Sequence, residues 1–118
     1  MVVSYNSLVA DTTGLGLRIH FNSNELSYNS QSNVLDTDFI FSADAAVADD
    51  ADFDANTSTD TYLDAGWASV NGNWPNEGMP ADLMTLTFDI NPETSGQTVI
   101  GVSAVSYTHL TLPTILLV

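Results

Sequence analysis

The chain has no cysteine and no lysine, and Arg18 is its one arginine against fifteen acidic residues. The lack of cysteine excludes a disulfide framework and any thiolate metal site. A formal net charge of −14 argues against nucleic-acid binding, because phosphate neutralisation needs a cationic surface. The same charge argues against anionic lipid, and no stretch before the apolar C-terminal end approaches the length of a membrane span. Self-repulsion strains such a fold, and bound cations would relieve it.

The C-terminal residues resemble a translated sequencing adapter. Residues 105–114 match, in order, one reading frame of the transposon-end adapter used in common library kits. A short variable barcode would encode residues 115–117, and the primer that follows begins with a valine codon and a stop codon, where the chain ends at Val118. We therefore expect residues 105–118 to be a non-native, adapter-derived tail that fold reasoning should exclude. Residues 1–104 are long enough for one domain with one core.

Apolar and polar residues alternate along most of the chain, which is typical of β-strands. Gly, Asn and Pro residues punctuate the alternating runs, and no helical stripe of useful length is present. The sequence therefore predicts an all-β, antiparallel sandwich. In the run 84–90, we expect one face to carry Met84, Leu86, Phe88 and Ile90. The other expected strands are residues 2–6, 15–21, 26–28, 39–41, 62–70 and 98–104.

Three of these segments resemble strands of cohesin-like domains. Residues 13–28, Thr-Gly-Leu-Gly-Leu-Arg-Ile-His-Phe-Asn-Ser-Asn-Glu-Leu-Ser-Tyr, resemble the early strand pair of that family. Residues 83–90, Leu-Met-Thr-Leu-Thr-Phe-Asp-Ile, resemble a later strand, and residues 62–70 resemble its middle strand. The resemblance implies a nine-stranded jelly-roll sandwich, related to carbohydrate-binding modules and without catalytic residues. It also implies truncation at one or both ends, with an unfilled sheet position and an exposed edge.

The chain further resembles versions of this fold that are repeated in large bacterial surface and adhesin-type proteins. That resemblance implies a non-catalytic binding, adhesion or spacer module at the cell surface, with neighbouring modules in the same polypeptide. A polysaccharide or a cell-surface protein would be its partner. Two alternatives stay open, a carbohydrate-binding module of a polysaccharide-degrading enzyme and a cohesin that docks a dockerin. A long acidic insertion departs from the cohesin pattern and weakens the docking alternative.

Nine of the fifteen acids lie within residues 36–64, and they are densest in residues 52–60. Four oxygen-bearing residues there occupy positions one, three, five and nine of an EF-hand-like loop, a spacing that wraps ligands around Ca²⁺. The glycine and the bidentate glutamate of a true EF-hand are absent. The sequence predicts a Ca²⁺-binding β-domain loop, and the alternative is a solvated acidic loop. The predicted ligands are Asp52, Asp54, Asn56 and Asp60, and Asp49, Asp50 or Asp64 could supply a further oxygen.

Without a cation, these crowded carboxylates should repel one another, which would raise their pKa values and leave the loop mobile. His20 points away from the apolar face of its strand, beside Arg18, and the sequence shows no partner for it as a ligand or general base. No nucleophile elbow, zinc motif or phosphate loop is present. We therefore do not expect an enzyme.

The two tryptophans are the remaining candidates for recognition. Trp67 lies in phase with the apolar residues of its strand, which favours core packing. Trp74 lies beside Asn73 in an amide-rich loop, and flat aromatic rings stack on sugars. The sequence therefore makes Trp74 and Asn73 the candidate carbohydrate contacts. The alternative for Trp74 is a loop anchor folded over the end of the sandwich.

Overall fold

A computed structural model describes residues 1–6, 11–12, 14–36, 39–42, 45–68, 74–75, 79–94, 96–107 and 114–117. Within these residues the chain contains only strands, turns and loops, and the strands form antiparallel sheets. The all-β, antiparallel prediction is confirmed. No helix in the described ranges is long and apolar enough to cross a membrane.

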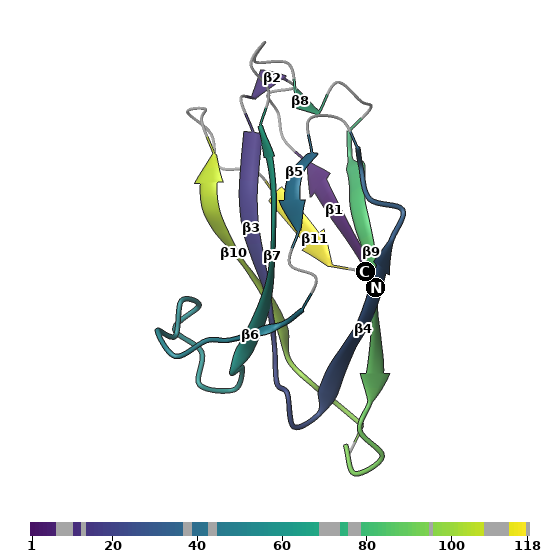
Figure 1. Cartoon of the computed structure of the whole chain (residues 1–118), viewed down its shortest axis with the longest axis vertical. Coiled ribbons are helices and arrows are strands. Elements are labelled where there is room, and N and C mark those ends of the chain that lie inside the picture. The colour runs from purple at the N-terminus through teal and green to yellow at the C-terminus, as the bar shows by residue number, and fades with distance from the viewer. Residues whose placement is uncertain are drawn as a thin grey trace.

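Two sheets face each other, and a short ribbon lies at one end of them (Figure 1). The first sheet has the order β11 (Thr114–Leu117), β1 (Val2–Asn6), β9 (Ala81–Ile90) and β4 (Leu26–Ser32). The second has the order β10 (Ile100–Tyr107), β3 (Gly14–Phe21), β7 (Thr61–Ala68) and β5 (Phe39–Ser42), with β6 (Val47–Ala48) also paired to β7. The ribbon pairs β2 (Asp11–Thr12) with β8 (Trp74–Pro75).

The core lies between the two sheets and follows the predicted alternation. Strand β3 buries every second side chain, and none of the four is more than 2% exposed: Leu15, Leu17, Ile19 and Phe21. Strand β7 adds Leu63, Ala65 and Trp67 to the same cluster. Burial of this apolar surface contributes about 25 cal/mol per Å² and is the main source of folding free energy.

Strand β9 departs from simple alternation at a β-bulge. Val3 pairs with Met84, but the next residue of β1, Ser4, pairs with Asp82, so Leu83 is an extra residue. The bulge allows Leu83 and Met84 to be buried in succession. At the other end of the strand, Ile90 is 71% exposed. The prediction that Ile90 shares a buried face with Met84 is therefore wrong, because the strand runs past the edge of the core.

The sheet position beside β1 is occupied. Strand β11 pairs with β1 in antiparallel register, from Val3 with Leu117 to Asn6 with Thr114. Among the described residues the position beside β1 is therefore filled by a strand from the segment that the sequence assigns to an adapter. The expectation of an unfilled position concerned residues 1–104 alone and stays a prediction. An edge strand offers unpaired N–H and C=O groups, and these can pair with almost any extended segment.

Candidate functional site

Residues 49–60, here called the acidic segment, form the connection between β6 and β7. This connection is the teal loop that projects beside the lower ends of β3 and β10 in Figure 1. The N–H of Asp49 donates to the carbonyl of Asp60 at 2.8 Å, and the N–H of Asp60 donates to the carbonyl of Phe21 at 3.1 Å. The two ends of the acidic segment are therefore joined to each other and anchored to β3.

The alternating acids and amides of the acidic segment hold its own turns. Oδ1 of Asp52 accepts the N–H of Asn56 at 3.0 Å, and Oδ1 of Asn56 accepts the N–H of Ser58 at 2.9 Å. The carboxylate of Asp49 accepts the N–H of Phe53 at 3.1 and 3.2 Å. Short side-chain acceptors of this kind stabilise turns in place of backbone partners. The predicted ligands Asp52 and Asn56 thus cap the backbone of the acidic segment itself.

An aromatic clamp attaches the acidic segment to the outer face of the second sheet. The guanidinium carbon of Arg18 lies 3.9 Å from the ring centroid of Phe53 and 5.2 Å from that of Tyr62. The Phe53 and Tyr62 rings meet edge to face at 5.9 Å. Phe53 belongs to the acidic segment, whereas Arg18 and Tyr62 lie on β3 and β7. The single arginine of the chain therefore bridges the sheet and the segment by cation–π contact.

Beside this clamp, two carboxylates of the acidic segment cover His20. The Nδ1 atom of His20 lies 3.3 Å from Oδ2 of Asp49 and 3.6 Å from Oδ2 of Asp54, with side chains that are 0%, 1% and 9% exposed respectively. The Nε2 atom is 2.7 Å from Oγ of Ser103 on β10. The expectation that His20 has no partner is wrong. No sequence spacing signals this cluster, because the folded loop brings its residues together.

The pKa values of Asp54 and Asp60 move opposite to the expected direction. Burial raises the pKa of Asp54, but the hydroxyl of Thr59, the nearby His20 and the N–H of Asn56 together outweigh it and lower the pKa. Burial likewise opposes ionisation of Asp60, and donors on its neighbours lower its pKa overall. The prediction from sequence took only the repulsion between carboxylates into account. In the structure, hydrogen bonds to the ionised carboxylates of Asp54 and Asp60, together with the nearby His20 for Asp54, lower their pKa values by more than burial raises them.

The four predicted Ca²⁺ ligands have different surroundings. Asp54 joins His20 and Asp49, and the candidate ligand atoms of these three residues lie within 4.8 Å of one another. Asp60 turns toward the β3–β4 connection, where its carboxylate accepts from the N–H and Oγ of Ser23 at 2.8 and 2.7 Å. Asp52 and Asn56 cap the turns described above. The structure thus brings the predicted ligand Asp54 together with Asp49, a candidate further ligand, and with His20, which lies outside the predicted set.

Both tryptophans lie in the core. Trp74 is 0% exposed, with its ring centroid 5.0 Å from that of Tyr5 and 5.7 Å from that of Trp67. The proposed sugar contact at Trp74 is therefore wrong, because a buried ring has no free face for stacking. Trp67 packs as predicted and donates from Nε1 to the carbonyl of Leu35 at 2.8 Å. Asn73 lies outside the described residues.

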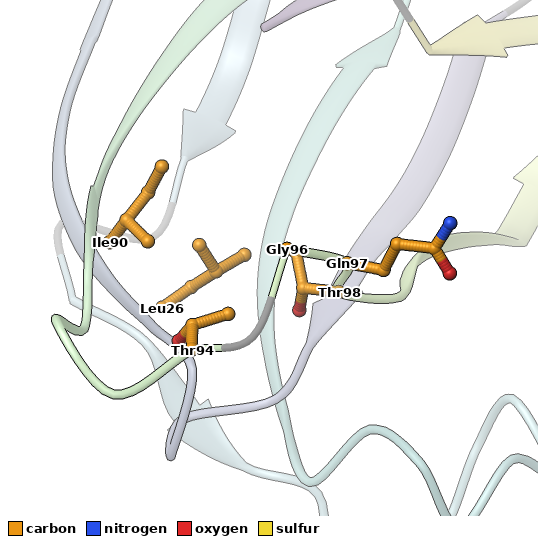
Figure 2. Close-up of a pocket in the computed structure, with 6 residues that line it drawn as sticks. All are labelled: Leu26, Ile90, Thr94, Gly96, Gln97 and Thr98. Atoms are coloured by element: carbon orange, nitrogen blue, oxygen red, sulfur yellow. The ribbon is translucent and has the colours of Figure 1, made fainter.

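Two surface hollows lie near the end of the sandwich where β9 leads to β10. Figure 2 shows the first, a cavity of about 160 Å³ lined by Leu26, Ile90, Thr94, Gly96, Gln97 and Thr98. The second has about 360 Å³ and is lined by Asn22, Glu25, Ser58, Gln97, Thr98 and Val99. No aromatic ring is among these lining residues. Neither hollow therefore offers the stacking platform of a typical sugar site.

Comparisons with protein families, with characterised proteins and with solved structures find no match to this chain. The resemblance to cohesin-like domains therefore rests on the strand motifs in the sequence. Its consequences for function are taken up below as a proposal. Apart from this resemblance, the structure shows the acidic segment packed on the outer face of the second sheet, over the buried His20.

Proposed function

We propose that this chain is a non-catalytic module of a larger bacterial surface protein, and that it acts in extracellular binding, adhesion or spacing. In this proposal the sandwich is a cohesin-like jelly roll, and a cation stabilises its acidic segment. Ca²⁺ is the ion that the sequence favours. The observation that carries the proposal is the docking of the acidic segment, whose ends and centre all contact the second sheet.

The charge of the molecule supports the cation. A chain of net charge −14 concentrates its acids beside one sheet face, where Arg18 supplies the one full side-chain positive charge. Asp50 and Asp52 are exposed on the segment, so a hydrated divalent ion can approach them without displacing the core. Binding of such an ion would reduce the self-repulsion that opposes the folded state.

The alternatives receive less support. A carbohydrate-binding module loses its named contact, because Trp74 is buried. A cohesin that docks through the outer face of the second sheet would have to compete with the acidic segment, which covers His20 and packs on Arg18 there. The adhesion or spacer function needs neither contact. It requires only a stable sandwich and a surface set by the acidic segment.

Thermal unfolding in Ca²⁺ and in chelator tests the proposal. At a free Ca²⁺ concentration one hundred times its Kd, binding to the folded chain alone adds about 2.7 kcal/mol and raises the midpoint. We expect the shift to shrink when Asp52→Asn removes an exposed ligand. Glu93→Gln is the matched control, since it removes one charge from an exposed loop outside the acidic segment. Equal midpoints in Ca²⁺ and chelator, or an equal shift from Na⁺ at the same ionic strength, would refute Ca²⁺ stabilisation.

A further inference from the structure

We propose that His20, Asp49 and Asp54 form a site for a divalent transition-metal ion, with Zn²⁺ as the best match, beneath the acidic segment. The inference goes beyond the proposed function, because its donors include an imidazole nitrogen on β3 that lies outside the predicted Ca²⁺ loop, and because an imidazole donor favours a different class of ion. It is carried by a buried ring atom that points at the buried carboxylate of Asp49 and the partly buried carboxylate of Asp54.

One ring nitrogen of His20, Nδ1, is buried and makes no hydrogen bond within the described part of the chain. On the other side of the ring, Ser103 Oγ can accept the Nε2 proton at 2.7 Å. That tautomer leaves a lone pair on Nδ1, facing carboxylate oxygens that are also lone-pair donors. Three electron-rich atoms in a buried space require a cation between them.

The distances from Nδ1 of His20 to the two carboxylates distinguish a bound proton from a bound metal ion. A protonated imidazole that donates to a carboxylate closes to about 2.7–2.9 Å. The observed separations of 3.3 and 3.6 Å are longer. Tetrahedral Zn²⁺ with bonds of about 2.0–2.2 Å places its ligand atoms about 3.3–3.6 Å apart. The two distances from Nδ1 thus fit pairs of ligands around a metal ion better than a shared proton. The three donor atoms together lie within 4.8 Å of one another, so the two carboxylates would have to move closer around a tetrahedral ion.

Each of the three ligand side chains is also hydrogen-bonded to a second residue, as the ligands of metal sites usually are. Ser103 orients the imidazole through the nitrogen that would not bind the metal. The hydroxyl of Thr59 donates to Oδ2 of Asp54 at 2.5 Å, and the N–H of Phe53 donates to the carboxylate of Asp49. Such outer partners fix the tautomer and the direction of each ligand.

The donor set also selects the class of ion. Ca²⁺ and Mg²⁺ take oxygen ligands, whereas imidazole with carboxylates suits Zn²⁺ and its neighbours in the first transition row. Three protein ligands leave at least one position of a tetrahedral ion for water or another donor. Because His20 lies on β3 and both carboxylates lie on the acidic segment, the ion would join the segment directly to the sheet.

The test is metal titration of the full 118-residue chain after chelator treatment. Co²⁺ gives a visible absorption band that reports tetrahedral coordination, and Zn²⁺ affinity follows from calorimetry and from displacement of Co²⁺. We expect one equivalent per chain. The chain has two histidines, which supply a matched pair of variants: His20→Gln should abolish the Co²⁺ band, and His109→Gln should retain it.

Variants of the carboxylates and of Ser103 sharpen the result. Loss of an outer partner of a metal ligand lowers affinity about 10- to 100-fold, so Ser103→Ala should fall in this range and Asp54→Asn should exceed it. Glu93→Gln removes one negative charge from an exposed loop outside the acidic segment and should leave Zn²⁺ affinity unchanged. Circular dichroism in chelator checks that each variant folds. If His20→Gln does not fold, the comparison of Asp54→Asn with Glu93→Gln decides the question.

Three outcomes would overturn the inference. The first is Co²⁺ or Zn²⁺ binding that survives His20→Gln and disappears in His109→Gln. The second is Ca²⁺ stabilisation that needs Asp52 while Zn²⁺ and Co²⁺ fail to bind, and this result would leave the proposed function intact. The third is nitrogen NMR that shows both ring nitrogens of His20 protonated and unchanged by either metal, which would assign the cluster to a charged hydrogen-bonded group.

Discussion

The contact of Arg18 with Phe53 should govern how often the acidic segment leaves the sheet. A double-mutant cycle isolates it, with Arg18→Met removing the charge but keeping the stem, and Phe53→Leu removing the ring face but keeping apolar volume. Phe53 is 49% exposed and lies 3.9 Å from the guanidinium carbon, so the pair is partly screened by water. A cation–π contact at such a site is worth about 0.5–1 kcal/mol. The coupling energy should therefore fall in this range.

Amide hydrogen exchange is the appropriate assay, because it separates local opening of the acidic segment from global unfolding. A coupling of about 0.5–1 kcal/mol changes the opening equilibrium about two- to fivefold. This change should be measured at the amides of residue 53, which donates to Asp49, and of Asn56, which donates to Asp52. Amides of Leu17 and Ala65, in the centre of the second sheet, should exchange as before.

A matched cycle of Arg18→Met with Glu93→Gln should be additive, since Glu93 lies in the exposed β9–β10 connection. The reasoning would be refuted by a coupling energy near zero for Arg18 and Phe53. It would equally be refuted if core amides accelerated as much as those of the acidic segment. That result would make the contact a part of global stability and not a clamp on one loop.

Three further predictions concern the core, a strand contact and acid stability. Trp74→Ala should lower the unfolding free energy by about 3–5 kcal/mol in urea titrations, and a loss below about 1 kcal/mol would place the ring at the surface. Gly14→Ala should prevent or severely impair folding by circular dichroism, because Gly14 has φ +146° and a Cβ there would clash with the backbone carbonyl oxygen of Trp67. Gly96→Ala, with nothing within 4 Å, should cost only backbone strain of about 1–3 kcal/mol. Desolvation opposes ionisation of Asp60, but hydrogen-bond donors on Ser23 and Thr61 lower its pKa in the folded state. Asp60 therefore contributes fully to the free energy of unfolding above its unfolded-state pKa of about 3.9, and this contribution is lost as the pH falls through the lower, folded-state pKa. The urea midpoint should therefore drop below about pH 4, with a shallower drop in Asp60→Asn, and superimposable pH profiles would contradict this role.

The strands could be predicted because their signal is local. Alternation in residues 15–21 reports one buried face, and β3 buries that face as expected. The bulge at Leu83 could not be predicted, because it depends on the register between β1 and β9. Ile90 was misassigned for a related reason: alternation indicates a face but does not show where the facing sheet ends.

The candidate site was less accessible to sequence reasoning. The alternating acids and amides of residues 52–60 are evident in the sequence, but their spacing suits both Ca²⁺ ligation and turn capping. In the structure Asp52 caps a turn by accepting the N–H of Asn56. His20 is far from Asp49 and Asp54 in sequence, and only folding of the acidic segment over β3 brings them together. Trp74 looked like a loop residue because the chain around it is amide-rich, yet it fills the end of the core.

The complete burial of His20 has a kinetic consequence. The His20 side chain is 0% exposed, so solvent does not contact the ring while the acidic segment covers it. Exchange at this nitrogen is therefore limited by how often the segment opens, whatever the concentration of the species outside. The clamp formed by Arg18 and Phe53 would then act as a gate, and a weaker clamp should speed both arrival and departure at His20 without changing the groups that hold the bound species.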